Sequence, residues 1–127
     1  MKTILVDALD AFVIEGKGVL KEMHDLLETY ENRKIILTNA DYKTDNKYGL
    51  NDMPYEVFTL KHEPNKPDPT YFTTMLAHFE LNAEDVVYFE HNAKAVKSAE
   101  SAGINSYYYD SEARDIVALK DFLDSNL

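Results

Sequence analysis

The sequence alternates short apolar runs, each ending at a polar residue, with longer segments whose apolar residues recur at helical spacing. The apolar runs cover residues 3–6, 34–37, 57–60, 86–89 and 106–109. Short continuous runs rich in Val, Ile, Leu and aromatic residues are typical of strands buried on both faces. Five strands separated by helical segments predict an α/β fold, a doubly wound five-stranded parallel sheet with helices on both faces. We expect residues 1–127 to form a single domain.

The helices between these strands are predicted from their apolar stripes and their end signals. Helical spacing covers residues 19–30, 68–79, 93–102 and 116–123, with a weaker pattern over 40–50. Asp68 is expected to cap the second of these helices, with Pro69 at its first helical position, where the missing N–H costs nothing. Gly103 is expected to close the third in a left-handed conformation.

Charge and composition exclude several functional classes. The chain has 13 Lys and Arg against 23 Asp and Glu, a formal charge of −10, and no Cys. Thiol nucleophiles, disulfides and zinc–thiolate sites are therefore absent. The negative charge disfavours nucleic acid and anionic membranes as partners. With no export signal and no apolar run of membrane-spanning length, we expect a cytoplasmic protein.

The residues that follow the predicted strands carry the chemistry. Ligands of such sheets bind beyond the carboxyl ends of the strands, where the strand order reverses. The residues at this edge are Asp7 and Asp10, Thr38 and Asn39, the loop 61–68, and Glu90, His91 and Asn92. Each has an ordinary structural interpretation too: Asp7 as a turn residue, Thr38 and Glu90 as helix caps, Lys66 as a solvated loop residue.

These residues in this order resemble the haloacid dehalogenase (HAD) superfamily, and the resemblance extends over residues 3–123. Its most specific parts are the tetrapeptide Lys66-Pro67-Asp68-Pro69 before an aromatic helix, and the block 86–103, in which a strand ends in an acid and an Ala-rich helix closes on Gly103-Ile104. The resemblance implies a HAD-like, Rossmann-type sheet.

The resemblance also implies a phosphate site. Asp7 would be the nucleophile, because a carboxylate that attacks phosphorus divides the reaction into two steps through an aspartyl-phosphate. Thr38 and Asn39 would bind the oxygens of the transferred group, and Lys66 would neutralise its charge. The implied cofactor is Mg²⁺, held by Asp7, Glu90 and the backbone carbonyl of Leu9, since hard oxygen ligands suit a hard cation.

The sequence departs from the family pattern at two places. Leu9 stands where the family's phosphatases have a second Asp, the general acid and base. Asp10 is the candidate catalytic residue to replace it, but it lies one residue too far, and on an extended chain it would point the wrong way unless a bulge intervenes. Glu90-His91 stands where two Asp residues are usual, and we expect His91 to be exposed and outside the chemistry.

Two functions from different classes remain open. One is a weak or specialised phosphatase-type hydrolase acting on a small phosphorylated molecule or a phosphorylated macromolecule. The alternative is a catalytically silent binding or scaffold protein with the same fold. A receiver-like phosphoacceptor domain fits less well, because its Asp follows the third strand and its Lys the fifth, where this chain has Lys61-His62 and Asp110-Ser111.

Residues 11–18 lie where this superfamily often inserts a cap domain. Eight residues suffice only for a small flap, hinged at Gly16 and Gly18. The site is therefore expected to be capless and open unless a large substrate or a second subunit, as in a homo-oligomer, covers it.

Overall fold

A computed structural model describes residues 1–43 and 47–127 of the chain, and its main feature is a five-stranded parallel sheet in the order β5-β4-β1-β6-β7. Its strands are β1 (Thr3–Asp7), β4 (Lys34–Thr38), β5 (Glu56–Thr59), β6 (Val86–Glu90) and β7 (Asn105–Tyr108). All neighbouring pairs are parallel. The predicted α/β fold is confirmed.

β1 lies at the centre of the sheet, and the strand order reverses around it. Every residue of β1 is buried. On one side Asp7 pairs with Leu37 of β4, and on the other Val6 pairs with Phe89 of β6. Because ligands of open parallel sheets bind at such a reversal, a ligand-binding site is expected at the carboxyl end of β1.

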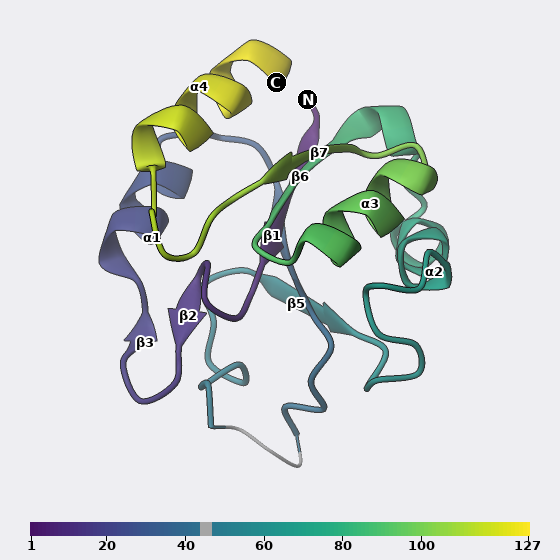
Figure 1. Cartoon of the computed structure of the whole chain (residues 1–127), viewed down its shortest axis with the longest axis horizontal. Coiled ribbons are helices and arrows are strands. Elements are labelled where there is room, and N and C mark those ends of the chain that lie inside the picture. Colours follow the sequence, from purple (N-terminus) through teal and green to yellow (C-terminus); the bar gives the residue numbers. More distant parts are fainter. Residues whose placement is uncertain (44–46) are drawn as a thin grey trace.

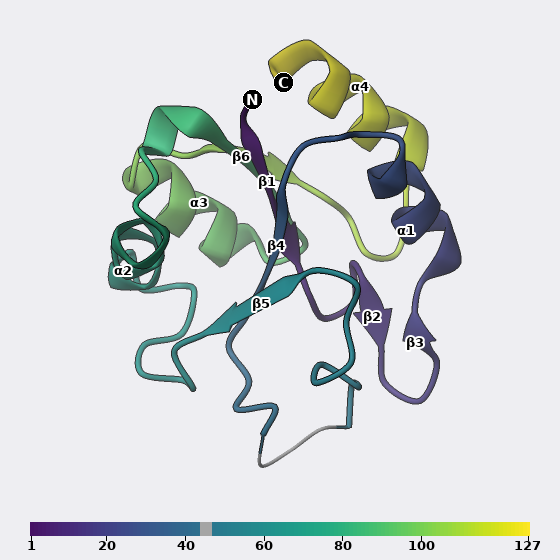
Figure 2. The same cartoon turned by 180° about the vertical axis from the view of Figure 1, so that it is seen from behind.

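Two helices cover each face of the sheet, as Figures 1 and 2 show from opposite sides. The helices are α1 (Lys21–Glu28), α2 (Thr70–Phe79), α3 (Ala93–Ser101) and α4 (Ile116–Asn126), with one 3-10 turn at Ala83–Asp85. Ile4 and Val6 pack in one core cluster with α1 and α4, while Leu5 packs in the other with α2 and α3. The alternation of side chains along β1 therefore supplies both halves of the core.

The predicted flap is a short antiparallel hairpin, β2 (Val13–Ile14) and β3 (Gly18–Val19). Phe12 and Val13 at its base are fully buried, so this part belongs to the core rather than to a loose flap. Val19 pairs with Val13, which is why the first helix begins at Lys21 and not at residue 19 as predicted.

The weak helix predicted over residues 40–50 is wrong where the structure describes it; residues 44–46 lie outside the described residues. Residues 40–43 and 47–50 form bends and turns, and Gly49 has a φ of 71°. A residue in the left-handed region interrupts a helix.

None of the helices described in residues 1–43 and 47–127 combines the length and apolar character needed to span a membrane.

Candidate active site

Asp7 and Glu90 end two neighbouring strands and lie on the same face of the sheet. Side chains alternate along a strand, so Asp7 shares the face of Leu5, and Glu90 shares the face of Tyr88. Leu5 and Tyr88 both belong to the core cluster beneath α2 and α3. Each carboxylate is only 1% exposed.

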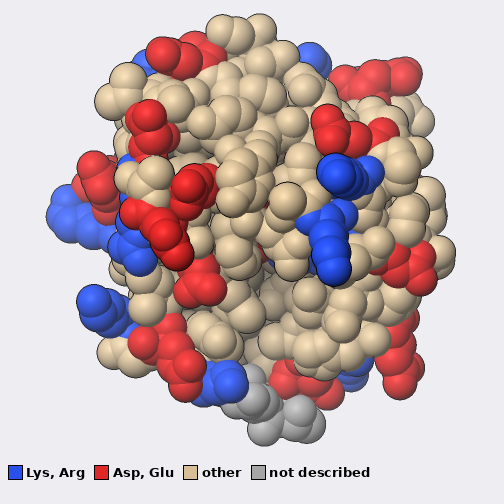
Figure 3. Space-filling view, viewed as in Figure 1, with Lys and Arg blue, Asp and Glu red and all other residues tan. Residues whose placement is uncertain are grey.

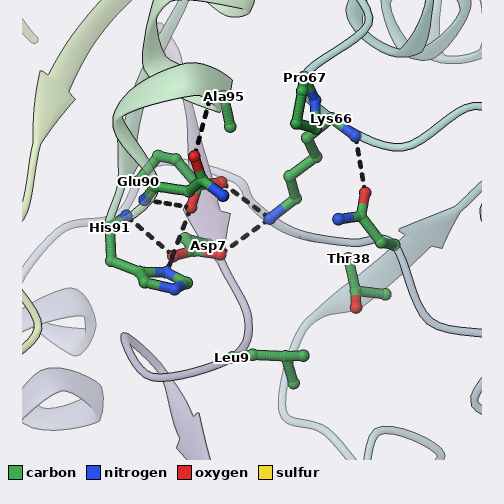
Figure 4. A pocket seen from close by; sticks show the side chains of 10 residues that line it. Asp7, Leu9, Thr38, Lys66, Pro67, Glu90, His91 and Ala95 are labelled. Atoms are coloured by element: carbon green, nitrogen blue, oxygen red, sulfur yellow. Dashed lines mark hydrogen bonds and ion pairs between the residues drawn. The ribbon is translucent and has the colours of Figure 1, made fainter.

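Lys66 reaches both carboxylates from the loop that precedes α2, the helix on that same face. Its Nζ lies 2.8 Å from Asp7 Oδ1 and 2.9 Å from Glu90 Oε1, and its side chain is 6% exposed. The side chain of Asn39 accepts a hydrogen bond of 2.7 Å from the Lys66 backbone N–H. As Figure 4 shows, three segments distant in the sequence converge on one ammonium group, as the sequence predicted.

The buried charges shift one another's pKa values. Burial raises the pKa of the Asp7 carboxyl, and the Lys66 ammonium opposes this. Burial alone would lower the pKa of Lys66, but the charges of Asp7 and Glu90 raise it above its ordinary value. Burial alone would raise the pKa of Glu90, but the Lys66 charge and neighbouring hydrogen bonds lower it. The result is a lysine held in its charged form between two carboxyl groups.

Glu90 is fixed by donors on both of its oxygens. Oε1 accepts from the Tyr88 hydroxyl as well as from Lys66, and Oε2 accepts from the backbone N–H of Asn92 at 3.0 Å. Asn92, not Glu90, caps α3: its Oδ1 accepts from the backbone N–H groups of Lys94 and Ala95. Glu90 is therefore not the N-cap of α3, and Asn92, two residues later, has that role.

Thr38 and Asn39, the expected phosphate-binding residues, line the same cavity of about 60 Å³ as the charged cluster. Thr38 is buried, and its hydroxyl accepts a hydrogen bond of 3.2 Å from the backbone N–H of Ala40. The Tyr71 hydroxyl donates to the Thr38 carbonyl at 2.7 Å and so joins α2 to this strand end. A cavity of this size can hold a few waters or one small oxyanion.

The sequence analysis placed His91 at this edge of the sheet but did not predict its contact with Asp7. Its side chain is 27% exposed, its Nδ1 contacts Asp7 Oδ2, and its backbone N–H donates to the same oxygen at 3.0 Å. Hydrogen bonds to Asp7 and Glu90 raise the pKa of His91 to about 10. His91 is therefore less exposed than expected and contacts the charged cluster directly. Its place directly after the acid of β6 was the available signal.

Asp10 also lies near the site, because the chain after β1 departs from the extended conformation. Its φ is 64°, so the chain after β1 is not extended there, and strand alternation does not decide where its side chain points. Asp10 Oδ2 lies 3.9 Å from His91 Nε2. A left-handed residue, rather than a β-bulge, therefore interrupts the extended chain at Asp10.

Leu9 lines the cavity but stands apart from the charged cluster in Figure 4. A hydrocarbon side chain can neither donate nor accept a proton at the position where the resembled phosphatases have their second Asp. Among the described residues, Asp7, Glu90 and His91 form a group whose donor atoms all lie within 4.8 Å of one another. These three side chains could therefore contribute to a metal site.

Comparisons with known proteins reveal similarity in structure alone. No protein-family model matches the sequence, and no curated protein matches it. A predicted HAD-like family hydrolase from Porphyromonas gingivalis superposes with a TM-score of 0.73 at 12% identity, over 97% of this chain and 98% of that one. A HAD family enzyme from Bacteroides thetaiotaomicron, in complex with magnesium and inorganic phosphate, superposes with a TM-score of 0.71 at 12% identity, over 94% of this chain and 98% of that one.

A third similar structure is D,D-heptose 1,7-bisphosphate phosphatase from B. bronchiseptica, complexed with magnesium and phosphate. Its TM-score is 0.70 at 12% identity, over the whole length of both chains. The chain therefore has the fold of the HAD superfamily, a Rossmann-like α/β sheet. The resemblance inferred from the sequence motifs is confirmed at the level of the fold.

Proposed function

We propose that this chain is a phosphatase-type hydrolase of the HAD kind, which transfers the phosphoryl group of a small phosphorylated molecule first to Asp7 and then to water. The observation that carries the proposal is the buried Lys66 ammonium, which bridges Asp7 and Glu90 at the reversal of strand order. A buried cation beside a carboxylate at this position fits a reaction that depends mainly on charge stabilisation.

Asp7 and Lys66 would divide the chemistry between them. A carboxylate oxygen of Asp7 attacks phosphorus while the bond to the leaving oxygen breaks, which gives an aspartyl-phosphate, and the leaving oxygen takes its proton from solvent water because Leu9 has none to give. Water then attacks that phosphorus, releases phosphate and restores the Asp7 carboxylate. Throughout, the Lys66 ammonium balances the negative charge on the phosphoryl oxygens, while Thr38 and Asn39 lie beside the cavity to orient them.

A divalent cation would be held by the carboxylates of Asp7 and Glu90, together with the backbone carbonyl of Leu9. Buried carboxylates with donor atoms this close fit such an ion, and Mg²⁺ is the ion in the phosphate complexes of the structural neighbours. When bound, the cation neutralises charge on the phosphoryl oxygens and orients the group for attack.

The hydrolase is expected to be slow, because Leu9 cannot act as general acid. General acid–base catalysis typically contributes about 10²- to 10⁴-fold. The same observation favours the second candidate, a catalytically silent binding protein with this fold, in which Leu9 reflects the loss of the general acid. The hydrolase would show turnover that requires Asp7, whereas the silent protein would show no turnover above background.

The test is hydrolysis of an aryl phosphate by the purified protein with Mg²⁺ or Mn²⁺, with Asp7→Asn as the matched control. We expect slow turnover that Asp7→Asn abolishes. Leu9→Asp is expected to raise the rate by about 10²-fold or more, because it supplies the missing acid to a site that is otherwise assembled. Equal background from the wild type and Asp7→Asn, with Leu9→Asp silent as well, would support the silent candidate.

A further inference from the structure

The ring of His91 lies against the two carboxylates that are expected to hold a cation. Its Nδ1 contacts Asp7 Oδ2 and lies 3.2 Å from Glu90 Oε2. The backbone hydrogen bond from His91 N–H to Asp7 fixes the start of the side chain, so the ring faces the cluster at the end of β6. Figure 4 shows the ring directed at Asp7 rather than away from the cavity.

The distribution of charge leaves room for a further cation. Asp7 and Glu90 are buried carboxylates, and both form their ion pair with the same ammonium, that of Lys66. With Lys66 the two buried acids carry one net negative charge, which either the ring of His91, within ion-pair distance of both acids, or a bound cation can balance. The oxygens turned away from Lys66, Asp7 Oδ2 and Glu90 Oε2, are the ones that His91 Nδ1 approaches.

Asp10 lies on the side of His91 where a metal-bound histidine usually has its outer partner, at a distance that is longer than a hydrogen bond. Histidine ligands commonly direct their second ring N–H at a carboxylate, which fixes the tautomer and the orientation of the ring. Here the Nε2 of His91 lies 3.9 Å from Asp10 Oδ2, on the side of the ring opposite Nδ1. The left-handed backbone of Asp10, with a φ of 64°, brings this carboxylate round to His91.

We propose that His91 Nδ1 is a direct ligand of the divalent cation, beside Asp7 and Glu90, and that the site therefore prefers a transition ion such as Mn²⁺, Co²⁺ or Zn²⁺ to Mg²⁺. The inference rests on the cation site of the proposed function. Mg²⁺ is bound mainly through oxygen, whereas an imidazole nitrogen suits the later first-row ions. Asp10 is a positioning residue for the histidine.

The test measures metal binding, independently of turnover. Metal is removed from the full-length protein with a chelator, and Co²⁺ is titrated in while its visible ligand-field absorption is followed. We expect His91→Ala to lower Co²⁺ affinity by about 100-fold and to change the bands, and Asp10→Asn to lower it by about tenfold, since outer partners of a ligand typically contribute about 10- to 100-fold. The matched control is His78→Ala, because His78 is exposed on α2 and packs against Phe58 and Phe79.

His91→Asp tests the preference itself. An all-oxygen ligand set is expected to favour Mg²⁺, so this variant should bind Mg²⁺ more tightly and Co²⁺ more weakly than the wild type does. If His91→Ala fails to fold, NMR of the ring nitrogens of the wild type gives a second test, in which we expect Zn²⁺ to shift the Nδ1 resonance of His91. Unchanged resonances at saturating Zn²⁺ would overturn the proposal.

The outcomes separate this inference from the proposed function. If Co²⁺ affinity is equal in the wild type and His91→Ala while turnover still requires Asp7, the histidine ligand is wrong and the hydrolase stands. If Co²⁺ binding requires His91 but no ion supports Asp7-dependent turnover, the ligand stands and the hydrolase is wrong.

Discussion

At the scale of single residues, the site depends on one lysine shared by two buried carboxylates. Glu90 is held from several sides, because Oε1 accepts from Tyr88 as well as from Lys66 and Oε2 accepts from the backbone N–H of Asn92. Removal of the Glu90 charge would leave Lys66 paired with Asp7 alone and would weaken the acceptor for the buried donors of Tyr88 and Asn92. The arrangement that holds the Lys66 ammonium is therefore also important for stability.

Glu90→Gln is expected to destabilise the metal-free protein by about 3 kcal/mol at neutral pH. Burial alone would raise the pKa of Glu90, but the Lys66 charge lowers it below the ordinary value. A carboxyl with a lowered pKa in the folded state contributes stability that is fully present above its unfolded pKa, and this stability is lost as the pH falls. The difference between wild type and variant should thus shrink below about pH 4, as urea unfolding at several pH values would show.

The control for this prediction is Glu56→Gln, which removes an exposed ion pair with Arg33. Exposed pairs contribute about 0 to 1 kcal/mol, so this variant should change stability little at any pH. A loss from Glu90→Gln no larger than that of the control, or one that grows as the pH falls, would contradict the prediction.

At the scale of elements, local end signals decide where the helices begin. Asp68 Oδ1 accepts from the backbone N–H of Thr70 at 3.0 Å, and Pro69 has a helical φ of −56°, so the predicted start of α2 is confirmed within a residue or two. The same logic places Gly103 after α3, with a φ of 86°. These signals act over a few residues and are therefore readable from the sequence.

Asn92→Ala is expected to cost about 1 kcal/mol of folding stability, because the side chain of Asn92 satisfies two backbone N–H groups at the start of α3. Asn92→Ser keeps a capping oxygen and should lose only a fraction of this. The midpoints of denaturant unfolding of the two variants give the comparison. Equal losses in both would show that the cap is not the cause.

At the scale of the whole molecule, the sheet is buried between two helical layers, and apart from Asp7 and Glu90 the acidic side chains of the described residues are not buried. Figure 3 shows acidic side chains distributed around the edge of one face, with basic side chains over α3, whose sequence carries Lys94 and Lys97. The chain, with a formal charge of −10, thus carries most of its acids at the surface, around a core in which Leu5 has no exposed surface.

Leu5→Ala is expected to destabilise the protein by about 2 to 5 kcal/mol, because the lost methyl groups leave a cavity beneath α2 and α3. Val117→Ala is the control, since Val117 is 71% exposed and should change stability by no more than about 0.5 kcal/mol. Chemical denaturation measures both. A small effect at Leu5 would mean that this face of the sheet is less tightly packed than the structure shows.

The sequence by itself determined the five strands of the parallel sheet, the boundaries of the four helices to within about three residues, and the strand-end positions of Asp7, Thr38 and Glu90. Those features follow from periodicity and capping, which act between near neighbours along the chain. The same reasoning failed over residues 40–50, where the described part forms turns rather than the weak helix expected.

Only the tertiary structure decided which side chains complete the cluster. His91 meets Asp7 because β6 becomes the neighbour of β1, a pairing between residues 84 positions apart that local patterns do not contain. Asp10 approaches His91 because its backbone adopts a left-handed φ, which the identity of the residue allows but does not require. Periodicity assigns a side chain to a face of its own element, whereas contacts between elements depend on how those elements pack.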